Sequence, residues 1–160
     1  RNVSPGQKTV SDMASSSSTF TCPACGATNR VPADKPAADA KCGRCTANLN
    51  LHKPIDVDDA ALARHLAHTN RPVLVDIWAE WCGPCRAMAP QFAAAAQTLA
   101  GQARLLKLDA DRSQTVKRLG VSGIPALILF RNGKVVDRKA GLMAADQLAL
   151  WVKDQTAAAG

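Results

Sequence analysis

Hydrophobic and polar residues alternate differently in the two parts of this 160-residue chain. From about residue 55 onward, short apolar runs alternate with segments in which apolar side chains recur every three or four positions. That alternation predicts strands separated by amphipathic helices, and hence an α/β domain. Residues 20–50 contain almost no large apolar side chains, so we expect them to lack a hydrophobic core and to need a covalent or metal cross-link.

The run at residues 73–79 is apolar except for Asp76, which predicts a buried strand. A helix is expected from about residue 83 to 100, with Pro84 in its first turn, where a missing N–H costs nothing, and with a kink at Pro90. The other expected elements are a helix at about 58–70, a strand at 103–108, a short helix at 113–119, strands at 126–130 and 134–138 flanking Asn132-Gly133, and a helix at about 144–156. Together these elements predict a central mixed sheet covered by helices on both faces.

The same patterns divide the chain into three parts. Residues 1–19 are polar and low in complexity, so we expect a disordered tail. Because the chain begins with Arg1 and Met13 precedes small residues, residues 1–12 are interpreted as a vector remnant or a processed leader. Residues 20–52 are expected to form a small separate module, and residues 53–160 the α/β domain.

Composition and charge narrow the classes of function. The chain is 47% hydrophobic and 21% charged, as is typical of a folded globular protein. Its net charge of +7 comes from basic residues scattered among acids and not interleaved with aromatics, which disfavours nucleic-acid binding. No run of about 18 apolar residues or apolar signal core is found, so we expect a soluble, non-exported protein without a membrane span. No Gly-x-Gly-x-x-Gly segment is found either, so no dinucleotide is expected to bind by that route.

Trp81-Cys82-Gly83-Pro84-Cys85 places two cysteines at the start of the predicted helix. A thiolate is the nucleophile in disulfide exchange, and the positive end of a helix favours a negative sulfur at Cys82. We expect Cys82 to attack a disulfide, and Cys85, which should be more buried and less reactive, to resolve the mixed disulfide. Inert core thiols or half of a metal site are the alternative, but the strand before and the helix after provide the context that a redox motif requires.

Asp76 is the third candidate catalytic residue. A carboxyl group buried in an apolar strand should have a raised pKa and can then accept a proton near neutral pH. We expect Asp76 to take the proton from Cys85, with Lys107 on the neighbouring strand moderating its charge. The alternative is an acid at a sheet edge that faces water.

A second set of cysteines forms two further Cys-x-x-Cys pairs, Cys22/Cys25 and Cys42/Cys45, separated by 16 residues. This spacing is within the range of zinc ribbons, and four thiolates suit tetrahedral Zn²⁺. Because the protein would fill every coordination position, the metal is expected to be structural and not catalytic. Two disulfides are the alternative, and His52 is a spare candidate ligand, although a solvated loop histidine is the simpler interpretation.

Residues from about 55 to 156 resemble a thioredoxin. The resemblance rests on Trp81-Cys82-Gly83-Pro84-Cys85, on Asp76 six residues before the first cysteine, and on Gly123-Ile124-Pro125, Asn132-Gly133 and Gly141. It implies a cis peptide before Pro125, packed against the redox pair and pairing its backbone with substrate. It also implies a flat apolar docking surface for protein substrates, formed by Trp81, Gly83, Pro84, Gly123, Ile124, Pro125 and Gly141. Ala126 departs from the family pattern, which usually has threonine there; this affects a local hydrogen bond and not the chemistry.

With the four-cysteine module in front, residues 20–156 resemble the zinc-bearing second class of bacterial thioredoxins. This resemblance implies a cytoplasmic protein-disulfide reductase that receives electrons from a separate NADPH-dependent thioredoxin reductase. Gly83-Pro84 between the cysteines resembles the reducing members of the fold more than its oxidases or isomerases. A different class of function stays open, in which the zinc ribbon binds protein or nucleic acid and the thioredoxin domain is a scaffold. For the module itself we expect redox-sensitive docking, with tuning of the redox pair as the alternative.

Overall fold

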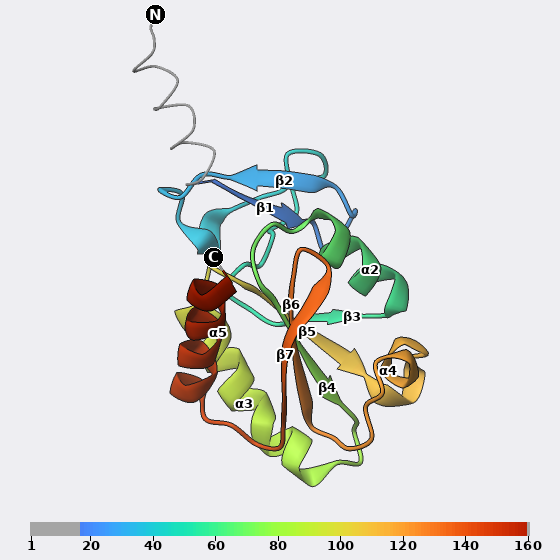
Figure 1. Ribbon diagram of the computed structural model, residues 1–160. Helices are drawn as coiled ribbons and strands as arrows, with labels where there is room; N and C mark the ends of the chain where they lie inside the picture. The colour runs from blue at the N-terminus through green and yellow to red at the C-terminus, as the bar shows by residue number, and fades with distance from the viewer. Residues whose placement is uncertain (1–16, 160) are drawn as a thin grey trace, which may run out of the picture.

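The computed structural model describes residues 17–159, and Figure 1 shows a small N-terminal module placed against one end of a larger α/β domain. The module contains the antiparallel strands β1 (Ser18–Thr21) and β2 (Thr28–Val31) and a short 3₁₀ helix (Ala37–Asp39). Most of the expected disordered tail lies outside the described residues, and its last two residues belong to β1. No helix within residues 17–159 is long and apolar enough to cross a membrane.

The larger domain is built on a five-stranded sheet with the order β3-β5-β4-β6-β7. Its strands are β3 (Ile55–Val57), β4 (Val73–Trp78), β5 (Arg104–Asp109), β6 (Ala126–Arg131) and β7 (Lys134–Ala140). The strands β3, β5 and β4 are parallel, whereas β6 runs antiparallel to β4 and β7 antiparallel to β6. The predicted hairpin is confirmed: Asn132 and Gly133 both have positive φ values, 54° and 78°, as a tight hairpin turn requires.

Helices cover both faces of the sheet, which confirms the predicted fold class. They are α2 (Asp59–His68), α3 (Gly83–Thr98), α4 (Thr115–Arg118) and α5 (Ala145–Ala159). Because side chains alternate along a strand, Leu74 packs with α3 and α5 residues on one face, and its neighbour Val75 packs with α2 and α4 residues on the other. The strand β3 was not predicted, because three residues carry too little pattern.

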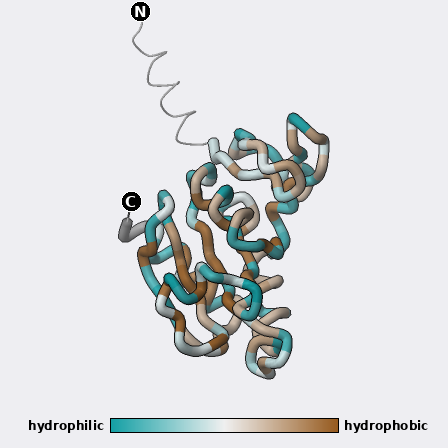
Figure 2. Tube along the Cα trace, turned by 90° about the vertical axis from the view of Figure 1, so that its right-hand side faces the viewer, coloured by the Kyte–Doolittle hydropathy of each residue, from teal (hydrophilic) through white to brown (hydrophobic). Residues whose placement is uncertain are grey.

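The N-terminal module buries a small core of its own, so the expectation that it has none is wrong. Phe20, Leu49 and Leu51 are buried in one cluster with Cys22 and Cys42. Phe20 is far from Leu49 and Leu51 in the sequence, and the three form no periodic pattern, so the sequence alone does not predict this core. Figure 2 shows the contrast in scale, since the strongly hydrophobic stretches lie mainly in the larger domain and the module is mostly pale or hydrophilic.

The module contacts the domain at the end of the sheet where β4 and β5 begin. Thr19 exchanges two hydrogen bonds with Asn70, one of 2.8 Å from its own N–H and one of 3.2 Å to its carbonyl. Arg71 Nε donates to Ser18 Oγ at 2.6 Å. The redox motif follows the other end of β4, which lies about 20 Å away for a six-residue strand. In Figure 1 the module is at the top, and α3 starts at the bottom.

Candidate functional site

Cys82 lies at the junction between β4 and α3, where a strand ends and a helix begins. It is the N-cap residue of α3, with extended backbone (φ −89°, ψ 112°), and its Sγ accepts the backbone N–H of Cys85 at 3.2 Å. Pro84 occupies the first turn, as predicted. The sulfur of Cys82 therefore faces the unpaired N–H groups of the helix, which stabilise negative charge there.

Cys82 and Cys85 form a disulfide, with their Cα atoms 5.2 Å apart. Cys85 is the more buried of the two, as predicted, but the difference is small, with 3% exposure for Cys85 and 5% for Cys82. What distinguishes them is their neighbourhood: Cys82 Sγ lies 3.9 Å from the carbonyl oxygen of Ile124, whereas Cys85 sits one turn inside α3. Cys82 is thus the sulfur beside the loop that precedes β6.

That loop contains a cis peptide bond between Ile124 and Pro125, as the resemblance implied. Ile124 packs against the two cysteines, and Gly141 donates its N–H to the carbonyl of Pro125 at 2.9 Å. The loop residues and Gly141 are therefore gathered next to the disulfide. Gly83, Pro84 and Gly123 are exposed around it, and Ile124 and Gly141 are half-buried.

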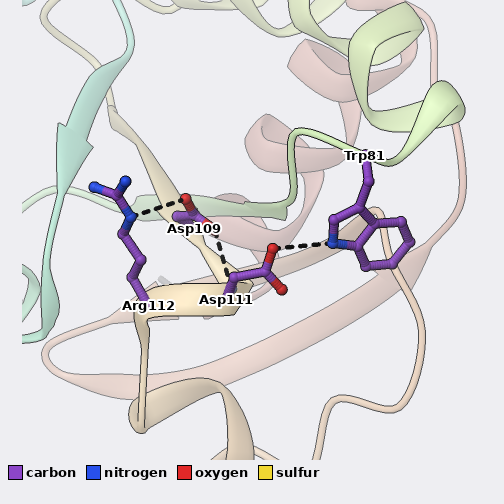
Figure 3. Close-up of polar contacts among 4 residues, drawn as sticks. All are labelled: Trp81, Asp109, Asp111 and Arg112. Atoms are coloured by element: carbon purple, nitrogen blue, oxygen red, sulfur yellow. Dashed lines mark hydrogen bonds and ion pairs between the residues drawn. The ribbon is translucent and has the colours of Figure 1, made fainter.

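Trp81 is the most exposed large hydrophobic side chain of the site, with 68% of its surface accessible. Its Nε1 donates to Asp111 Oδ2 at 2.9 Å, and Asp111 N–H in turn donates to Asp109 Oδ1 at 2.9 Å (Figure 3). Arg112 forms an ion pair of 3.8 Å with Asp109. This network was missed at the sequence level. Its signal is topological, because the C-terminal ends of the parallel strands β4 and β5 meet at the same edge of the sheet.

Asp76 is buried in β4, the strand that leads to the redox motif, with 1% of its surface exposed. Burial raises the pKa of Asp76 to about 6, and the positive charge of Lys107 opposes that rise. Neither carboxylate oxygen has a hydrogen-bond partner among the described residues. The predicted environment of Asp76 is thus found, and the interpretation as a water-facing acid at a sheet edge does not fit a residue in the central strand β4.

Lys107 lies beside Asp76 in the register of β4 and β5, as predicted. Its Nζ is 4.6 Å from the centre of the Trp78 ring, an arrangement that allows a cation–π interaction. Lys107 and Trp78 also line a cavity of about 490 Å³ that includes Asp56 and Glu80. This cavity brings solvent close to the lysine, next to the buried carboxyl.

The four remaining cysteines, Cys22, Cys25, Cys42 and Cys45, come together in the N-terminal module. Their sulfurs all lie within 4.8 Å of one another, and the pairs Cys22–Cys45 and Cys25–Cys42 are 3.6 Å apart. A zinc tetrahedron with Zn–S bonds of about 2.3 Å has sulfurs about 3.8 Å apart, so the donor set fits the metal. No disulfide joins any of the four, which leaves the two-disulfide alternative without support. His52 is not part of this cluster.

Backbone N–H groups donate to two of the four sulfurs. Cys22 Sγ accepts the N–H groups of Ala24 and Cys25 at 3.3 and 3.4 Å, and Cys42 Sγ accepts that of Arg44 at 3.3 Å. The Asn29 side chain, followed by backbone N–H groups, lowers the pKa of the Cys42 thiol to about 6. Such second-layer hydrogen bonds are typical around metal-bound thiolates.

Comparisons with known proteins agree with both parts of the chain. The thioredoxin family model matches residues 53–154, and the model described as Thioredoxin 2, N-terminal, a zinc ribbon, matches residues 21–47. Thioredoxin C-3 of Corynebacterium nephridii is 35% identical over 135 residues, which cover 84% of this chain and 92% of the relative. A thioredoxin of Pseudomonas aeruginosa is 40% identical over 99 residues, covering 61% of this chain and 92% of the relative.

Solved structures show the same fold for the larger domain. A mutant thioredoxin from Halobacterium salinarum has a TM-score of 0.57 at 34% identity, covering 66% of this chain and 93% of that one. Thioredoxin f from spinach chloroplast has a TM-score of 0.61 at 26% identity, covering 66% and 88%. The chain therefore belongs to the thioredoxin family, a family of thiol-disulfide oxidoreductases, and it carries the N-terminal zinc-ribbon domain of Thioredoxin 2.

Proposed function

We propose that this chain is a protein-disulfide reductase that works by dithiol-disulfide exchange through Cys82 and Cys85. The observation that carries the proposal is the position of Cys82: its sulfur caps α3, lies within bonding distance of Cys85 and faces the cis-proline loop. Helix N–H groups at the Cys82 sulfur stabilise the negative charge of an attacking thiolate, and the Cys85 sulfur is near enough to displace a bound substrate.

The reaction has two exchange steps. In the reduced protein, the Cys82 thiolate attacks one sulfur of the substrate disulfide, forms a mixed disulfide and releases the other substrate sulfur as a thiolate. The Cys85 thiolate then attacks Cys82, which releases the second substrate thiolate and leaves the Cys82–Cys85 disulfide. The substrate gains two electrons and the protein loses two. Because the second step is intramolecular, it escapes the entropy cost of bringing two molecules together.

Asp76 is proposed as the group that accepts the proton of Cys85 before the second step. A pKa of about 6 leaves Asp76 largely ionised at neutral pH and still basic enough to take a thiol proton through water. Lys107 is proposed to hold that pKa near neutrality, since its charge opposes the rise caused by burial. The solvent cavity at Lys107 and Trp78 supplies a path by which the proton leaves.

Protein substrates are proposed to dock on the surface around the disulfide. Exposed Trp81 supplies apolar area on one side of Cys82, and Gly83 and Pro84 add exposed surface directly after it. On the other side, the backbone at Ile124 is available to pair with an extended substrate segment, with Gly123 and Gly141 giving close access. Asp111 fixes the indole of Trp81 in this position through the 2.9 Å hydrogen bond.

Reducing equivalents are proposed to come from a separate NADPH-dependent thioredoxin reductase, as for the family that the chain resembles. The proposed compartment is the cytoplasm, because four free cysteines that hold a metal must stay reduced. Zn²⁺ is the proposed metal, and its role at a site closed by four sulfurs is to cross-link the module. The cysteines that would hold it are Cys22, Cys25, Cys42 and Cys45.

The direct test is turnover of insulin disulfides with NADPH and a bacterial thioredoxin reductase. The wild-type chain should consume NADPH in proportion to the disulfide reduced, Cys82→Ser should be inactive, and Cys85→Ser should trap a mixed disulfide with the substrate that is visible on a non-reducing gel. A measured reduction potential separates a reductase, near that of thioredoxin, from an oxidase. Full function of Cys82→Ser in vivo would instead favour a zinc-ribbon binding module on an inactive scaffold.

A further inference from the structure

Arg104 is the largest of the fully buried side chains, with 1% of its surface exposed, although it carries a full positive charge. It is the first residue of β5, in the larger domain, but its side chain reaches into the N-terminal module. Its Cζ lies 5.8 Å from the centre of the Phe20 ring, in the module's own core. A side chain of the thioredoxin sheet thus completes the interior of the four-cysteine module.

The guanidinium of Arg104 holds three carbonyl groups of the module. One Nη donates to Thr21 and Leu49 at 3.1 and 2.8 Å, and the other donates to Asn50 at 3.1 Å. Thr21 immediately precedes Cys22, whereas Leu49 and Asn50 follow the turn that carries Cys45. One side chain therefore ties together the entry to the first cysteine pair and the exit from the second.

The charge of Arg104 has no carboxylate to balance it. The only carboxylate ion pair within residues 17–159 joins Arg112 and Asp109, at the other end of the sheet. Burial lowers the pKa of Arg104 to about 10, and the opposing influence is the negative charge of Cys22. Arg104 therefore remains protonated at neutral pH. The negative charge that acts on it belongs to Cys22, one of the four candidate metal ligands. Burying a cation without a counter-charge costs free energy, so we expect a negative charge near Arg104 to compensate this cost.

A tetrathiolate zinc site provides that charge. Four thiolates and one Zn²⁺ carry a net charge of −2, which is itself unfavourable in a small, weakly polar module. We propose that Arg104 is a second-layer residue of the metal site, supplied by the thioredoxin domain: its cation offsets the anionic metal site and its hydrogen bonds fix both cysteine pairs. This inference rests on the zinc part of the proposed function.

Coupling of this kind acts in both directions. If Arg104 favours metal binding, then bound metal must favour the docked position of Arg104, and so the attachment of the module to β5, by the same factor. The module and the domain then form one cooperative unit when loaded with metal. This predicts two independent readouts, the zinc affinity of the module and the thermal stability of the whole chain.

The experiment is a competition of the full chain with a chromophoric zinc chelator, for the wild type, Arg104→Gln, Arg104→Lys and Arg71→Gln. Arg104→Gln should weaken zinc binding about 10- to 100-fold, the usual cost of losing a second-layer partner. Arg104→Lys keeps the positive charge but lacks the forked guanidinium group, so its zinc affinity should fall less than that of Arg104→Gln. Arg71→Gln is the matched control, because it removes a guanidinium from the same interface that donates to Ser18 and not to the cysteine turns; it should stay within about threefold.

Thermal unfolding with and without the chelator supplies the second readout. Zinc removal should lower the unfolding midpoint more in the wild type than in Arg104→Gln. The inference is overturned if folded Arg104→Gln binds zinc as the wild type does, if Arg71→Gln loses as much as Arg104→Gln, or if Arg104→Lys loses as much as Arg104→Gln. If Arg104→Gln does not fold, the zinc affinity of Arg104→Lys is compared with that of Arg71→Lys, and equal affinities overturn the inference. Failure of the wild type to bind zinc would instead refute the zinc site itself, and insulin turnover tests the reductase separately.

Discussion

The chain contains two kinds of Cys-x-x-Cys unit at opposite ends of one molecule. Both kinds begin alike, because the first sulfur accepts the N–H of the second cysteine, at 3.2 Å in Cys82/Cys85 and 3.4 Å in Cys22/Cys25. After the second cysteine they diverge. The backbone continues into α3 in one case, whereas at Gly26 (φ 81°) it turns back into a hairpin in the other.

This difference in backbone separates their chemistry. At the start of α3 only the sulfurs of Cys82 and Cys85 lie together, so they can form a disulfide with each other and exchange it with a third sulfur. Two hairpin turns aim four sulfurs at one point and create a site for a cation. The chemistry of a Cys-x-x-Cys pair therefore depends on the backbone element that follows the pair and not on the cysteine spacing alone.

The largest expected effect comes from exchanging one cysteine of each kind for serine. Cys82→Ser should lower insulin-disulfide turnover at least about 10³-fold, because a serine hydroxyl is not a nucleophile at neutral pH. Cys22→Ser should leave turnover per folded molecule within about threefold, since the module and the disulfide lie at opposite ends of β4, which is about 20 Å long. Steady-state NADPH consumption measures both. A loss in Cys22→Ser that matches Cys82→Ser would show that the two sites act as one.

Metal removal should separate the two regions by stability. A structural zinc contributes about 10 kcal/mol or more to the folding of an isolated finger, so the chelated module should lose most of its structure. The thioredoxin domain should keep its sheet, because its two cores lie away from the cysteine cluster. Hydrogen exchange would measure this, with β1 and β2 losing protection and β4 retaining it. Equal loss of protection in β4 would contradict independent folding of the domain.

Asp76→Asn should slow the second exchange step selectively. Removal of a general base costs about 10²-fold or more, whereas attack by Cys82 does not need this carboxylate. Quenched-flow analysis of the mixed disulfide should therefore show normal formation and slow release. In the wild type the release rate should rise with pH through about pH 6, where Asp76 ionises, and Asp76→Asn should lose that dependence. An unchanged release rate would remove Asp76 from the mechanism.

Asp76 should lower the stability of the folded protein at neutral pH, although it assists the exchange reaction there. The folded pKa of Asp76 is about 6 and its ordinary value is 3.8, so the folded state holds a proton that the unfolded state has released. That contribution is fully present below about pH 4 and is lost as the pH rises through 6, a change of about 3 kcal/mol at 1.36 kcal/mol per pH unit. Asp76→Asn should therefore be more stable than the wild type at pH 7 and similar at pH 4. Urea unfolding at both values measures the difference.

Much of this organisation was predictable from the sequence, for physical reasons that differ between the two regions. In the larger domain the elements and their order could be predicted, because each signal involves only neighbouring residues. These signals are the apolar run of β4, the helix start at Pro84 and the turn at Asn132. The contacts of Trp81 with Asp111 could not, because they depend on how two strand ends meet across the sheet. The near-equal burial of Cys82 and Cys85 also depends on packing from distant segments.

In the module, the spacing of the cysteines predicted four ligands but little of their surroundings. Phe20 and Leu49 are isolated in the sequence and gave no periodic signal, so the small core they form was missed. Arg104 lies in the strand predicted at 103–108, and nothing in the sequence marks it as buried. Only the docking of the module onto β5 makes it a buried partner of Thr21 and Leu49, and no local pattern encodes that docking.

The smallest expected effect concerns the two hairpin turns of the module, which carry different residues directly after the second cysteine. Gly26 and Thr46 occupy the same position, directly after the second cysteine, with φ values of 81° and 66°. A β-branched side chain is strained in this conformation by about 1–2 kcal/mol, whereas glycine is not. Thr46→Gly should therefore stabilise the zinc-loaded module by about 1 kcal/mol, less the entropy that glycine adds to the unfolded chain. Gly26→Thr should destabilise it, and by more, because a Cβ at that position would approach Arg64 to 3.2 Å. Rates of zinc release to a chelator rank the three proteins, and faster release from Thr46→Gly would show that the two turns are not equivalent.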